Sequence, residues 1–195
     1  MKKILLCLCL FVSACATYDV QEAMRPADRA IDSKLPNMEP IFEIGKASDT
    51  KSGDSDTASI QSNNHYATLF RREVEMNLIN ENGPIKGKLV LEPVFEKSTP
   101  SAWSIGIFFS YIPSLFGAPI LGTTFEWELE LNVLDKNGKR IARYLAQAKD
   151  TEYTALYYGY TNSYEAAALE SYKKALDDII KQVQADIPKL SAKLK

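Results

Sequence analysis

The residue whose surroundings point most directly to a particular chemistry is Cys15, which closes the stretch MKKILLCLCLFVSAC. A cysteine thiol is a nucleophile, so it can be joined covalently to another group as a thioether. Before it stand two lysines, an unbroken apolar run over residues 4–11, and the small residues Val12-Ser13-Ala14, which suit the cleavage site of a leader peptidase. The apolar run is far shorter than the ~20 residues that a membrane-spanning helix needs. We therefore predict a removable leader over residues 1–14.

The sequence Val12-Ser13-Ala14-Cys15 resembles the lipobox of bacterial lipoproteins. In that family the cysteine thiol takes a diacylglyceryl group, the leader is cut just before the cysteine, and the new amine is acylated, as with palmitate. The resemblance implies that Cys15 is the lipidated first residue of the mature chain and anchors it in a membrane. Ala16 follows the cysteine, which in the enterobacterial sorting pattern implies the outer membrane, facing the periplasm. The alternative is an ordinary cleaved signal peptide with a cysteine there by chance.

Composition indicates one folded domain without disulfides. The other two cysteines, Cys7 and Cys9, would leave with the leader. Hydrophobic residues make up 46% of the chain and charged residues 25%, which is unlike a disordered protein. Removing Lys2 and Lys3 from the 23 basic residues leaves 21 against 25 acidic ones, a net charge of −4. This charge argues against nucleic-acid binding and against electrostatic docking on anionic lipid.

Residues suited to catalysis or metal binding are few. His65 is the single histidine, placed where we expect the first helix to begin, and a zinc site would need further histidine or cysteine ligands. No G-x-S-x-G motif and no phosphate-binding loop occur. Glu126, Glu128 and Glu130 could collect a cation or steer a basic partner, but their alternation is first of all that of a solvent-facing strand side. We predict a protein that is not an enzyme and has no metal or cofactor.

No charged residue occurs between Lys97 and Glu126, and the apolar stretch 102–122 lies inside this gap. Prolines and glycines interrupt it, which argues against a membrane-spanning helix. It is either a loop that folds over the sheet and fills the core, or an exposed surface for another envelope protein, a second copy of the chain or a membrane. Such an interface would be formed by Trp103, Phe108, Phe109, Tyr111, Leu115 and Phe116.

A second candidate surface is the tyrosine-rich stretch YTALYYGYTNSY, residues 153–164. Each tyrosine offers a large apolar ring with a polar tip, which can stack on a sugar or anchor a protein interface. The same rings can instead close the joint between a strand and the last helix. If the stretch binds a glycan or another small ligand, the candidate residues are Tyr157, Tyr158 and Tyr160.

Alternating apolar residues predict the strands that must position these segments. Pro93 lacks an amide hydrogen for the ladder, so we place it at a sheet edge or bulge. Residues 135–138 (DKNG) form a hairpin turn in which Gly138 can take a positive φ. The predicted strands are residues 41–44, 87–97, 124–134 and 140–149.

Two helices complete the predicted domain. The first is capped by Asn63 or Asn64, at the end of a polar loop over 46–64, and stops at residues 82–84. The second runs over 164–187 and is ended or kinked by Pro188.

The resulting order is β-α-β-β-β-α, which predicts an α+β fold with two amphipathic helices packed on one face of a mostly antiparallel sheet. We assign residues 15–40 to the lipidated N-terminus and a tether, 41–188 to the single domain, and 189–195 to a C-terminal tail. The element order, with the DKNGKRIARY hairpin and an Ala- and Lys-rich closing helix, resembles small domains of envelope lipoproteins. These are the curli-secretion type, the TolB amino-terminal type and the penicillin-binding-protein activators, and the resemblance implies a protein of the cell envelope.

Overall fold

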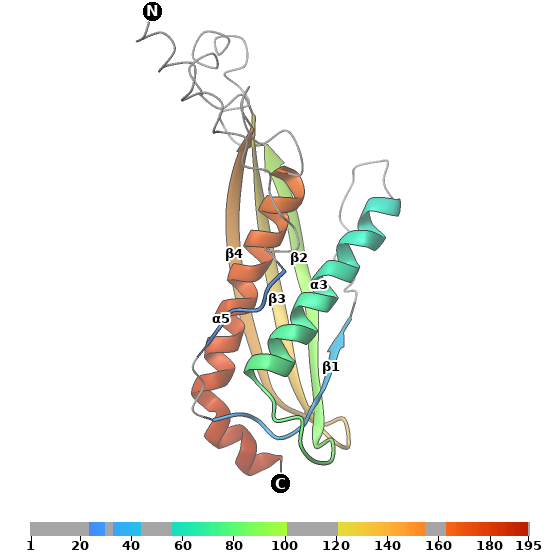
Figure 1. The fold of residues 1–195 in the computed structure, drawn as a ribbon, viewed down its shortest axis with the longest axis vertical. Coiled ribbons are helices and arrows are strands. Elements are labelled where there is room, and N and C mark those ends of the chain that lie inside the picture. The colour runs from blue at the N-terminus through green and yellow to red at the C-terminus, as the bar shows by residue number, and fades with distance from the viewer. Residues whose placement is uncertain (1–23, 30–32, 44–55, 101–120, 155–162, 195) are drawn as a thin grey trace, which may run out of the picture.

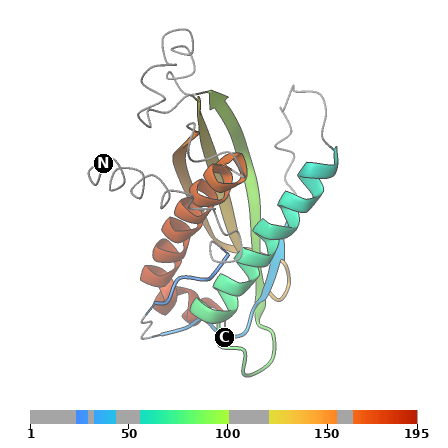
Figure 2. The ribbon, with the colours of Figure 1, turned by 45° about the horizontal axis from the view of Figure 1, so that its top comes forward.

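The computed structural model describes residues 24–29, 33–43, 56–100, 121–154 and 163–194. Its elements follow the predicted order of strand, helix, three strands and helix. In Figures 1 and 2 both helices lie on the same side of one sheet. The elements are β1 (Glu39–Phe42), α3 (Asp56–Asn77), β2 (Gly87–Pro100), β3 (Leu121–Asp135), β4 (Arg140–Thr154) and α5 (Ser163–Lys193).

The strands form a mostly antiparallel sheet in the order β1-β2-β3-β4. β1 is parallel to β2 and pairs with it from Lys88 to Leu91. The antiparallel ladder between β2 and β3 shifts register between Pro93 and Phe95, beyond the residues that pair with β1. Pro93 therefore lies at a bulge, as predicted for a residue without an amide hydrogen. The predicted α+β fold class is confirmed.

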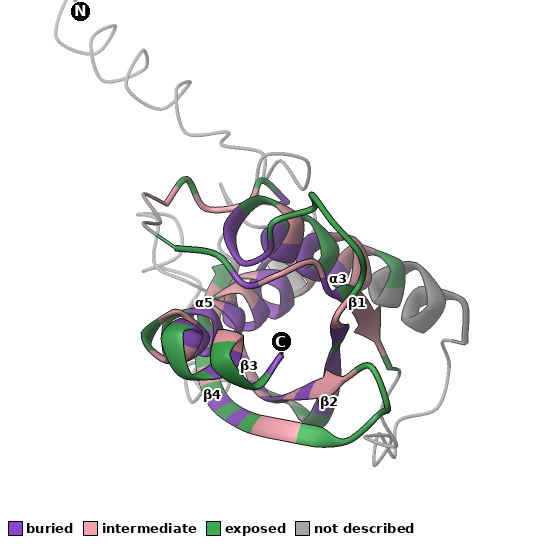
Figure 3. Ribbon diagram, turned by 90° about the horizontal axis from the view of Figure 1, so that it is seen from below, coloured by how far each residue is buried: buried purple, intermediate pink, exposed green. Residues whose placement is uncertain are grey.

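The inner face of β3 forms the centre of the core. Its alternate side chains point toward the helices, and the residues between them point to the opposite face, which no helix covers (Figure 3). This period of two fixes the register, because a slip by one residue would turn the apolar set to solvent. The inward set consists of Phe125, Trp127, Leu129, Leu131 and Val133, each at most 2% exposed.

The hairpin after β3 has the predicted turn. The carboxylate of Asp135 accepts hydrogen bonds from the backbone N–H groups of Asn137 (2.8 Å) and Lys139 (2.9 Å). Gly138 has φ +79°, a conformation that costs glycine little and other residues more. The turn thus returns the chain into β4 in antiparallel register.

α3 begins earlier than predicted. It starts at Asp56, so neither Asn63 nor Asn64 caps it, and the predicted loop over 46–64 is too long. The sequence from Asp56 to Asn64 contains no glycine or proline, so nothing in it breaks a helix once one has started. His65 accordingly lies inside the helix and not at its start. β1 also begins two residues before its predicted start, at Glu39.

The predicted tether over 15–40 is wrong for its second half, because described residues from Met24 onward belong to the domain. Met24, Leu35 and Met38 are buried in the same core cluster as the helices and the sheet. The backbone N–H of Leu35 donates to the carbonyl of Leu78 (2.8 Å), and its own carbonyl accepts from Asn80 (2.9 Å). The prolines that suggested a tether interrupt regular structure here without preventing packing.

The predicted tail over 189–195 is also wrong. α5 continues through Pro188 to Lys193, and both Leu190 and Leu194 are buried in the core. Proline removes one helical hydrogen bond, but burying two leucine side chains offsets that loss. The axis of α5 changes direction toward its C-terminal end in Figure 1, in agreement with the predicted kink.

Gly87 is expected to tolerate no larger side chain. A Cβ at this position would lie 2.1 Å from the carbonyl oxygen of Leu134 and 2.9 Å from Cε of Met38. Gly87→Ala must therefore separate the first rung of β2 and β3, and we expect a loss of about 1–3 kcal/mol in the free energy of unfolding in urea. Lys88→Ala, at the exposed neighbouring position, is the control and should cost less than about 0.5 kcal/mol. Similar losses for the two variants would contradict the clash.

Candidate functional site

The lipidation, interface and ligand-binding residues predicted from the sequence lie outside the described part of the chain. This holds for Cys15, for the apolar interface of Trp103, Phe108, Phe109, Tyr111, Leu115 and Phe116, and for the ligand surface of Tyr157, Tyr158 and Tyr160. Their described flanks do constrain where these segments leave the fold. Pro100 pairs with Thr123, and Leu121 pairs with Thr154. The apolar and tyrosine-rich segments therefore depart from the same end of the sheet, at neighbouring strands (Figure 1).

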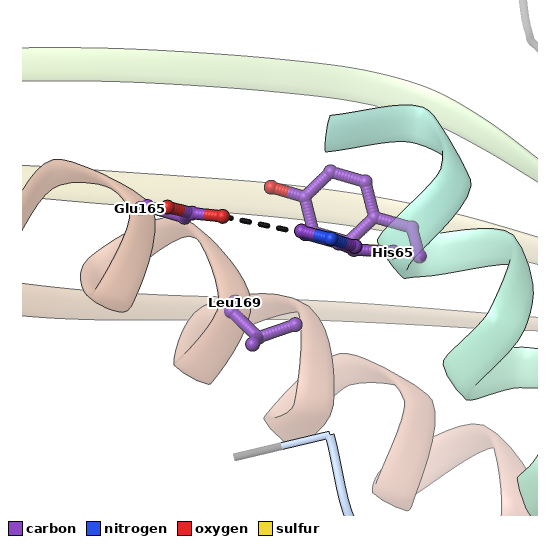
Figure 4. Close-up of a pocket in the computed structure, with 4 residues that line it drawn as sticks. His65, Glu165 and Leu169 are labelled. Atoms are coloured by element: carbon purple, nitrogen blue, oxygen red, sulfur yellow. Dashed lines mark ion pairs between the residues drawn. The ribbon is translucent and has the colours of Figure 1, made fainter. Parts of the chain in front are cut away.

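A shallow depression near this end lies between the two helices. His65 of α3 and Glu165 of α5 form its rim, with Nδ1 of the histidine 3.3 Å from Oε1 of the glutamate (Figure 4). Tyr66 and Leu169 complete the lining, and the empty volume of about 170 Å³ includes open solvent. Both rim side chains are more than one-third exposed. The arrangement is an ion pair across two helices when His65 is protonated, and none of its four residues supplies a hydroxyl or thiol activated by the histidine.

Three aromatic rings close the space beneath this depression. The ring of Tyr66 lies 4.9 Å from that of Trp127 and 4.7 Å from that of Tyr172, measured between centroids. The Tyr172 hydroxyl donates to the carbonyl of Tyr66 (3.1 Å), and Trp127 Nε1 donates to the carbonyl of Ala168 (3.0 Å). Burial raises the pKa of Tyr172 well above its ordinary value, so this hydroxyl stays protonated. These rings pack the core and leave no room for a ligand among them.

Two of the three glutamates of β3 are held by partners on the outer face of the sheet. Glu130 is only 9% exposed, although this face was expected to be solvated. It accepts hydrogen bonds from Arg143 (2.6 Å) and Asn132 (2.9 Å). Glu126 lies 2.8 Å from Lys149 on the next strand. Cross-strand basic residues thus pair with two of the three carboxylates that could otherwise have collected a cation.

A buried polar cluster that the sequence did not reveal joins the N-terminal segment to both helices. Glu73 is 5% exposed and accepts from the backbone N–H of Ala27 (2.7 Å) and from Asn77 Nδ2 (2.7 Å). Asn77 Nδ2 also donates to the carbonyl of Ala27 (2.9 Å), and the Arg29 guanidinium donates to Asp177 of α5. The i, i+4 spacing of Glu73 and Asn77 was the available signal, but it indicates only a helix face and not the distant segment that they bind.

Within the described ranges, no three histidine, cysteine, aspartate or glutamate side chains gather as they would around a metal ion. In that same part of the chain, no helix combines the length and the apolar character of a membrane span.

Neither family models nor curated proteins match this sequence. Among solved structures, a protein from Caulobacter crescentus CB15 provisionally assigned as a lipoprotein shares 13% identity, over 80% of this chain and 90% of its own, with a TM-score of 0.39. A minor lipoprotein from Acinetobacter baumannii shares 11% identity over 81% of this chain and 92% of its own, with a TM-score of 0.31. A Xanthomonas campestris protein of family DUF330 shares 10% identity over 82% of this chain and 90% of its own, with a TM-score of 0.38. Similarity this low establishes neither a lipid anchor nor a function.

The Glu130–Arg143 pair should make stability depend on acid pH. The hydrogen bond from Arg143 is the main cause that lowers the pKa of Glu130 below 4.5, and burial opposes it. A lowered folded-state pKa means that the stabilisation is complete above pH 4.5 and disappears as the pH falls through the folded value. Wild type should therefore exceed Glu130→Gln in free energy of unfolding at pH 7, and the difference should shrink progressively below pH 4.5.

Urea unfolding at several pH values measures this difference. Glu128→Gln is the matched control, because this side chain lies on the same strand face but is less buried, and it should have the smaller effect. A difference for Glu130→Gln that stays constant between pH 7 and pH 3 would contradict the role of the ionised pair.

Proposed function

We propose that this protein is a non-enzymatic lipoprotein of the bacterial cell envelope, anchored through Cys15 and binding another envelope protein or a second copy of itself through residues 102–122. The observation that carries the anchor is the order of two lysines, apolar run, small residues and Cys15 at the start of the chain. Ala16 favours the outer membrane, with the domain facing the periplasm. Several acyl chains, at ~0.8 kcal/mol for each buried methylene, would hold the protein permanently.

The interface part of the proposal is supported by the position of the strand ends. β2 and β3 are long antiparallel strands, and their pairing reaches Pro100 and Thr123. The intervening apolar segment therefore leaves from the end of the sheet that lies opposite to the hairpin between β3 and β4. The helices cover the inner face of the sheet, where Trp127 and Tyr66 already pack together. A long uncharged segment that departs from one end of such a domain is well placed to contact a partner.

The non-enzymatic part of the proposal rests on the small number of reactive groups in the sequence. His65, the single histidine, faces Glu165 in a depression floored by packed aromatic rings. Glu126 and Glu130 of β3 are paired with basic residues. General acid-base or nucleophilic catalysis needs reactive groups that converge on space for a substrate, and these residues do not provide it.

Cys15→Ala tests the anchor. The wild-type chain should fractionate with membranes and carry the mass of a diacylglyceryl group and an amide-linked acyl chain on its first residue. The variant cannot form the thioether, so we expect loss of the lipid mass and release of the domain into the soluble fraction. Equal membrane association of the two chains, with no lipid mass on the wild type, would refute the lipoprotein assignment.

Phe109→Lys and Phe116→Lys test the interface. We expect each variant to melt within a few degrees of wild type but to lose at least tenfold in affinity for its partner, or in self-association measured by sedimentation. Met76→Lys and Ile85→Lys are the controls, because these side chains are 55% and 59% exposed. Met76 is next to the last residue of α3, and Ile85 precedes β2 at the end opposite to Pro100. Unfolding of the phenylalanine variants alone would instead place these rings in the core.

The alternative is a module that binds a glycan or another small ligand through Tyr157, Tyr158 and Tyr160. One observation favours it, since Tyr153, at the start of this stretch, is 37% exposed. Peptidoglycan fragments would then change tyrosine and tryptophan fluorescence saturably, and the Phe109→Lys and Phe116→Lys variants would respond like wild type. No change over a wide range of concentrations would count against this alternative.

A further inference from the structure

The two edges of the sheet are built differently. β1, at one edge, has only four residues and includes Pro40. Beyond β1, the open part of β2 carries Pro93, Pro100 and the bulge between Pro93 and Phe95. Short strands, prolines and bulges are features by which proteins prevent another strand from adding to a sheet edge. The β1 edge is therefore protected against pairing.

β4 forms the other edge of the sheet and lacks this protection (Figure 1). It has 15 residues and contains neither proline nor glycine. Its ladder with β3 is regular from Ala142 to Thr154. In the described part of the chain, no strand lies on the other side of β4.

The backbone of β4 is oriented so that it can pair with a further strand. The carbonyl of Leu145 accepts a hydrogen bond from Nε2 of Gln182 (3.0 Å), so the backbone groups of Leu145 point away from β3. Backbone direction alternates along a strand, and Arg143, Gln147 and Lys149 therefore present their N–H and C=O groups to the same edge. The single bond from the Gln182 side chain would be replaced by a backbone bond when a strand is added.

The charged side chains of this edge are neutralised by their own sheet. Charges on an edge strand, lysine above all, often repel an approaching strand. Here Arg143 is paired with Glu130 (2.6 Å), and Lys149 is paired with Glu126 (2.8 Å). Both pairs lie on the outer face of the sheet, so they leave the backbone edge open.

On the inner side of the sheet, the end of β4 carries an excess of negative charge. Asp150 is paired with Lys174 (2.8 Å), and Glu170 of α5 is paired with Lys173 (3.6 Å). Burial raises the pKa of Glu152, and the charges of Asp150 and Glu170 raise it further, while Lys174 lowers it. Glu152 is thus the carboxylate in excess at this end.

The first half of β4 carries an excess of positive charge on the same side. The hydroxyl of Tyr144 donates to Asp186 of α5 (3.2 Å). The hydrogen bond from Lys189 is the main cause that lowers the pKa of Asp186, and the charge of Lys193 lowers it further. Two lysines therefore face one carboxylate beside Tyr144.

We infer that two copies of this chain associate through β4, which pairs antiparallel with its counterpart and joins two four-stranded sheets into one of eight strands. The two-fold axis is perpendicular to the sheet, so both helix layers lie on one side and both outer faces on the other. Antiparallel pairing brings Glu152 of each copy beside the lysines near Tyr144 of the other, whereas parallel pairing would oppose like charges. The inference goes beyond the proposed function, because it uses neither Cys15 nor residues 102–122.

The register of this pairing follows from the backbone and the charges. Residues whose backbone groups point to the edge must oppose each other, so the two-fold axis passes through a residue of β4. An axis at Ala146 would oppose Arg143 to Lys149, and an axis at Lys149 would oppose this lysine to itself. An axis at Ala148 lies at the midpoint of the regular ladder over 142–154 and pairs all of it.

The axis at Ala148 also matches the side chains on both faces. On the inner face it places Glu152 opposite Tyr144. On the outer face it places Arg143 opposite Tyr153, whose ring is 37% exposed. A guanidinium beside a tyrosine ring is an attractive contact. This register therefore opposes no like charges across the two-fold axis.

Sedimentation of matched variants tests the association. All chains start at Cys15 and carry Cys15→Ser, which prevents a disulfide between copies. We expect the otherwise unchanged chain to form a reversible dimer. Gln147→Pro should weaken the dimer at least tenfold, because proline removes an edge-facing amide but no bond to β3. Gln147→Ala is the control, since it loses the same side chain but keeps the amide, and it should associate like the unchanged chain.

Disulfide formation tests the register without altering the strand backbone. The axis at Ala148 places Leu145 of one copy opposite Thr151 of the other, with Cα atoms about 5.5 Å apart, which a disulfide can span. The two copies of residue 145 would lie six residues apart along the strand, or about 20 Å. A mixture of Leu145→Cys and Thr151→Cys chains should therefore cross-link on oxidation, and neither variant alone should do so.

Three outcomes would overturn the inference. The first is a chain that stays monomeric up to about 1 mM. The second is equal association of Gln147→Pro and Gln147→Ala, or a mixture of cysteine variants that cross-links no better than either variant alone. The third is loss of association in Phe109→Lys but not in Gln147→Pro, which would place the contact in residues 102–122 and support the proposed function instead.

Discussion

The contact of Trp127 with Tyr66 and Tyr172 is the interaction on which the rest of this domain depends. It joins one residue each from β3, α3 and α5, with ring centroids 4.7–5.6 Å apart. The polar atoms of two of these rings are satisfied close by, because Trp127 Nε1 and the Tyr172 hydroxyl donate to backbone carbonyls of the two helices. The helices are thereby fixed both by apolar burial and by hydrogen bonds with defined geometry. A substitution of any of these rings would loosen the sheet and both helices together.

This cluster also decides what the nearby depression can be. A histidine and a glutamate at 3.3 Å, in a hollow between helices, have the chemical character of a reactive site. The packed rings below them remove the depth that a substrate would need, and the two rim groups remain well solvated. The same packing that stabilises the domain therefore keeps this depression shallow.

Most of the fold could be predicted from local patterns in the sequence. The alternation on β3, the DKNG turn, the bulge at Pro93 and the apolar stripe of α5 each depend on residues close in sequence, so they could be predicted. The packing of residues 24–29 on the helices could not be predicted, because Glu73 and Ala27 are 46 residues apart and their hydrogen bond follows from no periodicity. Nor could the extension of α5 past Pro188, which depends on burial of Leu190 and Leu194. The residues of the two candidate surfaces could be read from the sequence. That the apolar and tyrosine-rich segments leave from the same end of the sheet follows only from the strand pairing.

The N-terminal segment has a structural role that its composition conceals. Met24, Leu35 and Met38 belong to the core, so the described residues from Met24 onward are part of the folded domain although prolines punctuate them. Residues 24–29 contact both helices, because Ala27 binds side chains of α3 and Arg29 donates to Asp177 of α5. A buried carboxylate is costly unless it is hydrogen-bonded, and Glu73 meets this requirement only with the N-terminal segment in place. The bonds of Glu73 to Ala27 and Asn77 therefore make the packing of this segment a condition for the stability of α3.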